Sequence, residues 1–208
     1  MGGKVITIAQ QKGGSGKTTL AVNLAVAFLR AGHRVALLDT DPQGSLGRWF
    51  MARRERMEDA GMDLSTASAW GVSYECDKLS RSNDFIIIDT PPKVDADLRP
   101  ALRVADLVLI PVASSHVDLW ATEGVLDLAA REGKRATIVL NRTKAGTRLG
   151  ADVARAAGEL SCELADARLS QRMIYAETLG LGLGALEGAR GPAGAEVLAL
   201  ADEVLGLM

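Results

Sequence analysis

A glycine-rich stretch near the N-terminus, Gln10–Leu20 (QQKGGSGKTTL), carries residue types that bind phosphate. Its second half, beginning at Gly16, fits the end of the phosphate-binding pattern G-x-x-x-x-G-K-[ST]. The first glycine of that pattern should be residue 11, which is Gln, and a second lysine, Lys12, follows it. The stretch therefore predicts a phosphate-binding loop that departs from the standard form and carries an additional positive charge.

Each residue type in this loop has a chemical use. The glycines let successive backbone N–H groups turn toward phosphate oxygens, and the start of the following helix adds a favourable dipole. We expect Lys17 to reach the β and γ phosphates, Thr18 to hold Mg²⁺ and Thr19 to donate to the α phosphate. A glycine-rich turn that binds nothing is one alternative, and a dinucleotide site is another, although it needs a glycine where Thr19 stands. The predicted phosphate-contacting residues are Gly13, Gly14, Ser15, Gly16, Lys17, Thr18 and Thr19.

Three aspartates follow apolar runs and can serve a magnesium ion. Asp89 ends the run FIIID, where a phosphate-loop enzyme places the carboxylate that anchors Mg²⁺; a residue that caps the next turn is the structural alternative. Asp39 and Asp41 end another run, and alternation along a strand points both side chains the same way. We expect one to join the metal shell and the other to orient the attacking water, with Asp41 the catalytic choice because it lies further into the loop.

The base is inferred from an absent motif. Enzymes that read guanine use an Asp in N-K-x-D, and the corresponding strand here ends in LNRTKAG without that acid. Adenine is therefore favoured. Asn141 could bond the adenine edge, but an Asn at a strand end is equally often a turn former, and both interpretations stay open.

Short apolar runs alternate with helical segments, which is typical of an α/β protein. The sequence predicts a P-loop NTPase fold, with a mainly parallel sheet and helices on both faces, because runs such as LVLIPV are apolar on both sides. The expected strands are Lys4–Ala9, Arg34–Asp39, Asp84–Asp89, Asp106–Val112 and Arg135–Asn141, with a weaker one at Met62–Ser68. The expected helices follow the phosphate loop and span 146–158, 171–179 and 192–207, and 180–194 is expected to be a surface loop.

Length, net charge and cysteine content limit the number of domains and the kinds of protein that are compatible with this sequence. A chain of 208 residues with 48% hydrophobic content favours a single domain over residues 1–208. The net charge of −2 excludes a global basic field, so any nucleic-acid contact must come from a local patch. The two cysteines, Cys76 and Cys162, form no chelating set, which indicates a reduced, cytoplasmic protein, and neither a signal peptide nor a membrane span is predicted.

Five segments together resemble one known family. KGGSGKTT, DTDPQGS, IIIDTPP, LIPVASSHVDLWAT and LNRT occur in this order and are similar to the ParA/MinD family of deviant Walker ATPases. The short chain, the lack of an N-terminal helix-turn-helix extension and the late segment RLSQRMIYAE resemble the small plasmid-partition ATPases of the ParF type. Such proteins often carry prolines where this chain has Ser114, Ser115 and His116, which weakens any expectation of filaments.

The resemblance implies a role for Lys12. In the family, the corresponding lysine reaches across a nucleotide-sandwich homodimer to the phosphates of the other subunit. The implied cofactors are ATP and Mg²⁺, with slow hydrolysis that resets the switch. On this basis Lys12 joins the nucleotide-binding residues, and the predicted catalytic residues are Lys12, Lys17 and Asp41. The predicted metal ligands are Thr18, Asp39, Asp41 and Asp89, and Asn141 is the predicted base contact.

The resemblance also implies partners. An ATP-bound dimer would bind DNA non-specifically on the nucleoid, and a ParB-like centromere-binding or adaptor protein would act on it. Basic residues occur late in the chain and in the segment 48–58, but acids are interleaved, so ordinary solvated helix faces are an equal interpretation. The late basic residues are Arg142, Lys144, Arg148, Arg155, Arg168, Arg172 and Arg190.

Three rival functions share parts of these motifs. A MinD-like membrane switch would end in a basic amphipathic helix, whereas the last 17 residues contain Glu196, Asp202 and Glu203 and no Lys or Arg, so no membrane partner is expected. A metal-cluster reductase needs two cysteines beyond Asp89, where only Cys162 stands. An ATP-dependent small-molecule ligase stays possible on fold alone.

Overall fold

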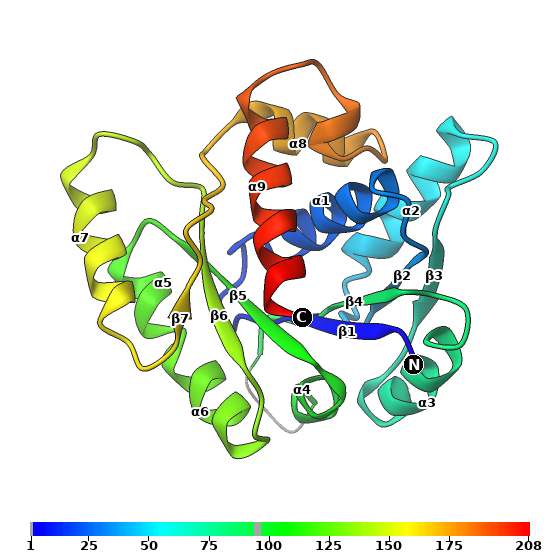
Figure 1. The fold of residues 1–208 in the computed structure, drawn as a ribbon, viewed down its shortest axis with the longest axis horizontal. Helices are drawn as coiled ribbons and strands as arrows, with labels where there is room; N and C mark the ends of the chain where they lie inside the picture. Colours follow the sequence, from blue (N-terminus) through cyan, green and yellow to red (C-terminus); the bar gives the residue numbers. More distant parts are fainter. Residues whose placement is uncertain (1, 94–96) are drawn as a thin grey trace.

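The computed structural model describes residues 2–93 and 97–208, and in these a seven-stranded sheet has the order β3-β2-β4-β1-β5-β6-β7 with every pairing parallel. Figure 1 shows the sheet running through the middle of the molecule with helices around it. The strands are β1 Lys4–Ile8, β2 Val35–Asp39, β3 Asp63–Thr66, β4 Phe85–Asp89, β5 Leu107–Ala113, β6 Ala136–Asn141 and β7 Glu163–Leu164. The α-helices are α1 Lys17–Arg30, α2 Ser45–Arg56, α3 Val72–Leu79, α4 Arg99–Val104, α5 His116–Trp120, α6 Glu123–Arg131, α7 Arg148–Gly158, α8 Met173–Gly180 and α9 Pro192–Leu207, and two short 3₁₀ helices span Ala69–Gly71 and Ala185–Glu187.

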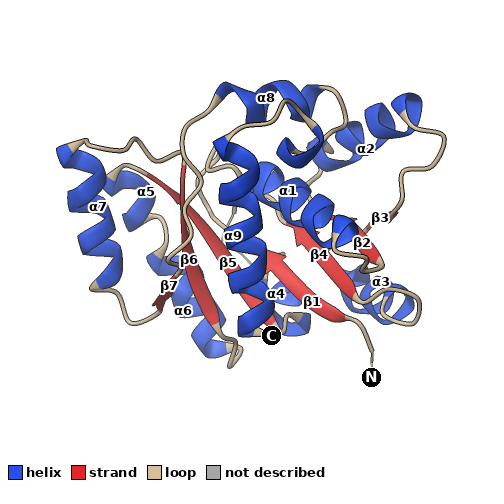
Figure 2. Ribbon diagram, turned by 45° about the horizontal axis from the view of Figure 1, so that its top comes forward, coloured by secondary structure: helices blue, strands red, loops and turns tan. Residues whose placement is uncertain are grey.

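Helices cover both faces of this sheet because its central strands are apolar on both sides. Alternate residues point to opposite faces: Ile6 and Ile8 of β1 join the cluster that includes α1, α2 and α9, whereas Val5 joins the cluster under α3. A further cluster packs α4 to α7 against β5 and β6. Helices on either side of the red strands are visible in Figure 2. The predicted fold class, a parallel sheet between helical layers, is confirmed.

Helix α1 is buried on nearly all sides, which explains its apolar sequence. It starts directly after Gly16 and ends before Gly32, whose φ of 90° lies in the left-handed region that glycine adopts freely. Between these ends, the residues from Leu20 to Phe28 are all buried. Helix α9 packs on α1 through buried Val197 and Leu200, so the predicted closing helix is confirmed and lies in the main core.

The expected elements differ from the observed ones at two places. The sequence does not predict β7, an edge strand of only two residues that has no apolar run of its own. The segment 180–194, expected to be a surface loop, is partly buried: Leu183 and Ala185 lie in the interior. A Cβ on Gly182 would lie 2.2 Å from the backbone N of Arg53, so this glycine allows close packing and not only turning.

The strand order brings the expected site residues to one edge. Strands β2, β4 and β1 are neighbours, and Asp89 at the end of β4 is in register with both Asp39 and Ile8. The loop after β1 leads into α1, so the phosphate loop (residues 10–19) and two of the aspartates meet at the carboxyl edge of the sheet. No helix within the described residues is long and apolar enough to cross a membrane.

Candidate functional site

The phosphate loop has a backbone conformation that depends on glycine. Gly14 and Gly16 have φ values of 75° and 92°, which only glycine adopts without strain. A Cβ on Gly16 would lie 2.2 Å from Nδ2 of Asn141, whereas a Cβ on Gly14 would meet nothing within 4 Å. Both conformation and space therefore require glycine at position 16, while position 14 needs it for conformation alone.

Lys17 folds back over its own loop. Its side chain is buried, and Nζ donates to the backbone carbonyl of Gln10 at 3.1 Å. Burial lowers the pKa of Lys17, and the negative charges of Asp89 and Asp41 oppose that shift. A cation held in a partly desolvated loop interacts strongly with an anion, because little water competes for it.

Thr18 and Asp89 form the centre of the site. The Thr18 hydroxyl donates to Oδ2 of Asp89 at 2.6 Å. The other oxygen, Oδ1 of Asp89, and the hydroxyl of Ser15 are buried without any hydrogen-bond partner among the described residues. Such orphaned polar atoms are costly in a folded protein, and they indicate where a bound group completes the site.

Hard oxygen ligands of this kind suit Mg²⁺. Within the part of the chain that the structure describes, no three His, Cys, Asp or Glu side chains form a metal cage. Mg²⁺ commonly takes one or two protein oxygens and completes its octahedron with phosphate oxygens and water. The Thr18 hydroxyl and the free oxygen of Asp89 fit that incomplete set.

Asp89 also has the most perturbed acidity at this edge. Burial raises the pKa of Asp89 to about 7, with further increases from Asp39 and Asp41, while the Thr18 hydrogen bond and Lys17 lower it. A carboxylate crowded by two other acids is a poor place for a lone negative charge and a favourable one for a divalent cation.

Asp39 and Asp41 have different surroundings. The buried carboxylate of Asp39 accepts from the backbone N–H groups of Asp41 and Gly47, each at 3.0 Å, so it fixes the loop and the first turn of α2. Burial raises the pKa of Asp39 although these hydrogen bonds lower it. Asp41 is half-buried and accepts only from the N–H of Gln43 among the described contacts. The freer carboxylate is thus Asp41, while a place for Asp39 in the metal shell stays a prediction.

Lys12 makes an ion pair that the sequence does not reveal. Its Nζ lies 2.9 Å from Oδ1 of Asp118, with the Lys12 side chain 38% and the Asp118 side chain 5% exposed. Asp118 is at the start of α5, where its backbone N–H donates to the hydroxyl of the N-cap residue Ser115, and that hydroxyl also contacts the Asp118 carboxylate. The ammonium group of Lys12 is therefore held by a residue of α5.

Asn141 joins the phosphate loop to the next part of the site. Its Nδ2 donates to the carbonyl of Ser15 at 2.9 Å, and its Oδ1 accepts from the N–H of Arg142. Arg142 has a φ of 52°, the one positive value among the described non-glycine residues. Both ends of the Asn141 amide are thus engaged within the protein, and base reading by Asn141 stays a prediction.

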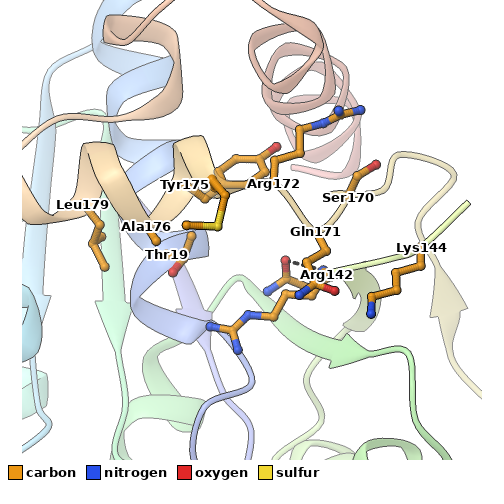
Figure 3. A pocket seen from close by; sticks show the side chains of 11 residues that line it. Thr19, Arg142, Lys144, Ser170, Gln171, Arg172, Tyr175, Ala176 and Leu179 are labelled. Atoms are coloured by element: carbon orange, nitrogen blue, oxygen red, sulfur yellow. Dashed lines mark hydrogen bonds between the residues drawn. The ribbon is translucent and has the colours of Figure 1, made fainter.

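A pocket of about 460 Å³ opens beside Thr19 and continues from the phosphate loop. Figure 3 shows Thr19 on one side of it, with Arg142 and Gln171 facing it from the other. Residues 170–176, which connect to and begin α8, form most of its far side, and we name them the base-side wall. A pocket of this size accommodates a nucleoside, and it has the right position for one whose phosphates occupy the loop.

The late basic residues differ in their surroundings, and Arg142 and Arg172 line the pocket beside Thr19. Lys144, Arg148 and Arg168 line a shared hollow of about 640 Å³. Arg172 is paired with Glu196 at 2.7 Å, and Arg155 lies within 4 Å of both Asp152 and Glu159. Arg148 also lies 3.9 Å from Asp152, but its side chain is 96% exposed. In the second basic segment, Arg53 is buried and paired with Glu187, so it is not a free cation. Lys144, Arg148 and Arg168 are therefore the best placed of the predicted set for an anionic partner.

Sequence reasoning misses the residues that support the predicted ones. The side chain of Gln10 donates to the Thr122 hydroxyl at 3.1 Å and ties the phosphate loop to the N-cap residue of α6. The spacing of Ser115 and Asp118 matches a capping pattern, S-x-x-D, and could have located α5. Nothing in the spacing links Asp118 to Lys12, because their contact joins two distant segments.

The arrangement can do one kind of chemistry well. Lys17 and the loop N–H groups would hold anionic oxygens, Thr18 and Asp89 would hold a divalent cation beside them, and Asp41 would face water near both. Positioning and charge stabilisation of this type are what phosphoryl transfer requires.

Comparison with known proteins gives a consistent result. Residues 4–130 match the family described as ATPase MipZ. A curated relative, the maintenance of carboxysome distribution protein A of Halothiobacillus neapolitanus, is 27% identical over 208 positions that cover 96% of this chain and 95% of the relative. The chromosome partitioning protein ParA of Caulobacter vibrioides is 30% identical over 164 positions covering 60% of each chain.

The fold is shared with solved structures at lower identity. The septum site-determining protein MinD of Pyrococcus horikoshii, solved with Mg-ADP, superposes with a TM-score of 0.82 at 19% identity, over 97% of this chain and 95% of that one. The loop, the strand order and the helical layers described above are therefore those of a known P-loop architecture.

Proposed function

The chain belongs to the MipZ/ParA/MinD family of P-loop ATPases, and from that premise we propose that it is a nucleotide-controlled switch that positions a cargo inside the cell. It is an ATPase, and we assign the activity to one domain spanning residues 1–208. The observation that carries this assignment is the Thr18–Asp89 contact, with the unpaired Asp89 oxygen beside it.

Hydrolysis follows from the roles of four side chains. We assign Lys17 to the β and γ phosphates, Thr18 and Asp89 to Mg²⁺, and Asp41 to the attacking water. When bound, Mg²⁺ supplies positive charge that stabilises the phosphoryl group in the transition state. Asp41 suits the water because its carboxylate is half-buried and accepts one local hydrogen bond, whereas the carboxylates of Asp39 and Asp89 are buried.

Dimerisation is assigned to Lys12. In the proposed sandwich, Lys12 leaves Asp118 and reaches the phosphates that the partner subunit binds. The extra negative charge of a γ phosphate favours that move with ATP over ADP. The ion pair with Asp118 supports this assignment, because among the described contacts the Lys12 ammonium group is paired with α5 and not with an atom of its own loop.

The ATP-bound dimer is proposed to bind DNA without sequence preference and to meet a ParB-like or adaptor partner on the nucleoid. Lys144, Arg148 and Arg168 of two subunits would supply the cationic surface. The cargo is proposed to be a plasmid, a chromosome or a protein assembly. The names of relatives support positioning as the shared theme, since they refer to carboxysome distribution and to chromosome partitioning.

A membrane-cycling switch is a weaker proposal. Val197, Leu200 and Val204 of α9 are buried against the core, and Glu196 and Glu203 accept hydrogen bonds from the protein itself. Leu198 is the one large apolar side chain of α9 that is strongly exposed, and a single leucine does not form the apolar face that insertion into a lipid surface needs. A ligase would need an acceptor substrate before it released phosphate.

The test combines three measurements on the purified chain. We expect phosphate release from ATP with Mg²⁺ and no added acceptor, a doubling of mass with ATP but not ADP in light scattering, and DNA gel shifts that require ATP and weaken steeply with salt. Phosphate release only with a small-molecule acceptor would favour a ligase. Equal DNA affinity with ATP, ADP and no nucleotide would exclude the switch.

A further inference from the structure

One carboxylate outside the phosphate loop, that of Glu196, accepts hydrogen bonds from three residues of the base-side wall. Glu196, on α9, accepts from the N–H of Ser170 at 3.0 Å and from its hydroxyl at 2.7 Å. It also accepts from Nε and Nη2 of Arg172, at 3.0 and 2.7 Å, and from the hydroxyl of Tyr175 at 2.8 Å. A carboxylate offers about four lone-pair positions, so Glu196 is fully committed to this wall.

The charge of Glu196 is preserved in this setting. Its side chain is only 16% exposed, and burial raises the pKa of Glu196, but the hydrogen bonds from Arg172, Ser170 and Tyr175 outweigh burial and keep the pKa below its usual range. Burial and the neighbouring carboxylate raise the pKa of Tyr175, so its hydroxyl stays a donor. Hydrogen bonds to an ionised acceptor are the strong ones.

The helix that carries Glu196 is itself fixed to the phosphate side. Helix α9 packs against α1 in the main core, and α1 begins with Lys17 and Thr18. Figure 3 shows Arg172 and Tyr175 above the pocket, away from Arg142 and Lys144. Glu196 therefore links the far side of the pocket to the same packed unit that holds the phosphate loop.

We propose that Glu196 is a positioning residue for the nucleotide, which holds the base-side wall at the correct distance from the phosphate loop. The assignment rests on the proposed function, because it places the base and ribose in the pocket beside Thr19. Glu196 itself is not among the residues that line the pocket. Its effect is exerted through Ser170, Arg172 and Tyr175, all of which line that pocket.

The same helix provides a matched control. Glu203 lies on α9 and accepts from the backbone N–H groups of Asp166 and Ala167, each at 2.8 Å. Neither of those residues lines the pocket. Glu203→Gln thus removes a similar charge and similar hydrogen bonds from the same helix without touching the base-side wall.

The experiment compares Glu196→Gln with Glu203→Gln and the unchanged chain, using a fluorescent ATP analogue and steady-state hydrolysis. For Glu196→Gln we expect Kd and KM for ATP to rise about tenfold, the size of a lost charge-assisted hydrogen bond, with kcat within about twofold. For Glu203→Gln we expect Kd and KM within about twofold of the unchanged chain. Far-UV circular dichroism verifies that each variant is folded.

The outcomes separate the two proposals. If the unchanged chain binds no ATP analogue, the proposed function fails and this assignment fails with it. If the unchanged chain binds and Glu196→Gln matches it, or if both glutamate variants lose affinity equally, only the role of Glu196 is overturned. If Glu196→Gln does not fold, Tyr175→Phe decides: a rise in KM of about threefold supports the assignment, and an unchanged KM overturns it.

Discussion

The phosphate side and the base side of the pocket are held in different ways. On the phosphate side, the key contacts lie within one short loop or between the first turn of α1 and the end of β4, as in Lys17 with Gln10 and Thr18 with Asp89. On the base side, residues of the wall are held by Glu196, which is 21 to 26 positions away along the chain. The phosphate-side contacts follow from the loop and its neighbouring strands alone, whereas the base-side contacts depend on how helix α9 packs.

This difference has a mechanical consequence. The phosphate side is formed by backbone geometry, so substitutions there should abolish binding or chemistry outright. The base side is formed by side chains on a packed helix, so substitutions there should weaken binding in a graded way. Variants on the two sides, and on the residue that joins them, test the contrast.

The largest effect is expected for Gly16→Ala on the phosphate side. An Ala here would have to adopt a φ of 92°, and its Cβ would lie 2.2 Å from Nδ2 of Asn141. Displacement of the loop by about 1 Å can cost about a hundredfold in activity, so we expect at least that loss in ATP affinity and hydrolysis. We also expect the free energy of unfolding to fall by about 2–3 kcal/mol.

Gly14→Ala is the control for that loss. Gly14 has a φ of 75° but open space around its Cβ, so thermal unfolding should show a cost of only about 1–2 kcal/mol. Equal destabilisation by both variants would show that the close contact between a Cβ at position 16 and Asn141 costs no additional free energy.

The contrast between the phosphate side and the base side also explains which parts of the fold and the site are predictable from the sequence. The phosphate loop, its strand and its helix are neighbours in the chain, so their residue types predict both fold and chemistry, and six of the seven strands are recovered from apolar runs. Strand β7 is missed because two residues carry no periodicity. Asp118 and Glu196 are missed as site residues because their partners, Lys12 and the base-side wall, become neighbours only after folding.

The second prediction concerns the choice between two acids. For Asp41→Ala we expect phosphate release to slow about a hundredfold while ATP affinity stays within about twofold, because the residue acts on water and not on ground-state binding. The dimer should then persist with ATP. Phosphate release at the rate of the unchanged chain would remove Asp41 from the mechanism.

Asp39→Asn is the matched comparison. Asp39 accepts two backbone N–H groups, so its loss should lower the free energy of unfolding by about 2 kcal/mol, measured by urea denaturation. Asp41→Ala should change that free energy by less than about 1 kcal/mol, since Asp41 is half-buried with one local hydrogen bond.

The third prediction removes the additional lysine. Lys12→Ala leaves the carboxylate of Asp118, which is 5% exposed, without its cation, so we expect a folded monomer whose free energy of unfolding falls by about 1–3 kcal/mol. The dimer formed with ATP loses two charge-assisted contacts, one from each subunit. At about 1 kcal/mol each, after subtraction of the Asp118 ion pair that Lys12 gives up, the dimer should weaken about thirtyfold. Light scattering over a concentration series measures the dimer constant.

Asp118→Asn is the control for Lys12. It removes the negative charge but not the phosphate contact assigned to Lys12, so dimerisation with ATP should be at least as tight as in the unchanged chain. If Asp118→Asn and Lys12→Ala weaken the dimer equally, the ion pair within one subunit, and not a reach across the dimer, is what dimerisation needs.

The smallest effect is expected at Asn141, which joins the two sides. Its amide donates to the Ser15 carbonyl of the phosphate loop and accepts from the N–H of Arg142 at the edge of the pocket. If Asn141 acts only as this link, Asn141→Ala should weaken ATP and GTP binding alike by about fivefold, the size of one buried hydrogen bond. If Asn141 reads adenine, the variant should lose affinity for ATP while its affinity for GTP stays the same. Competition binding with the two nucleotides distinguishes these cases. Because both ends of the amide are already engaged, we expect the equal loss, and the preference for adenine must then come from the base-side wall itself.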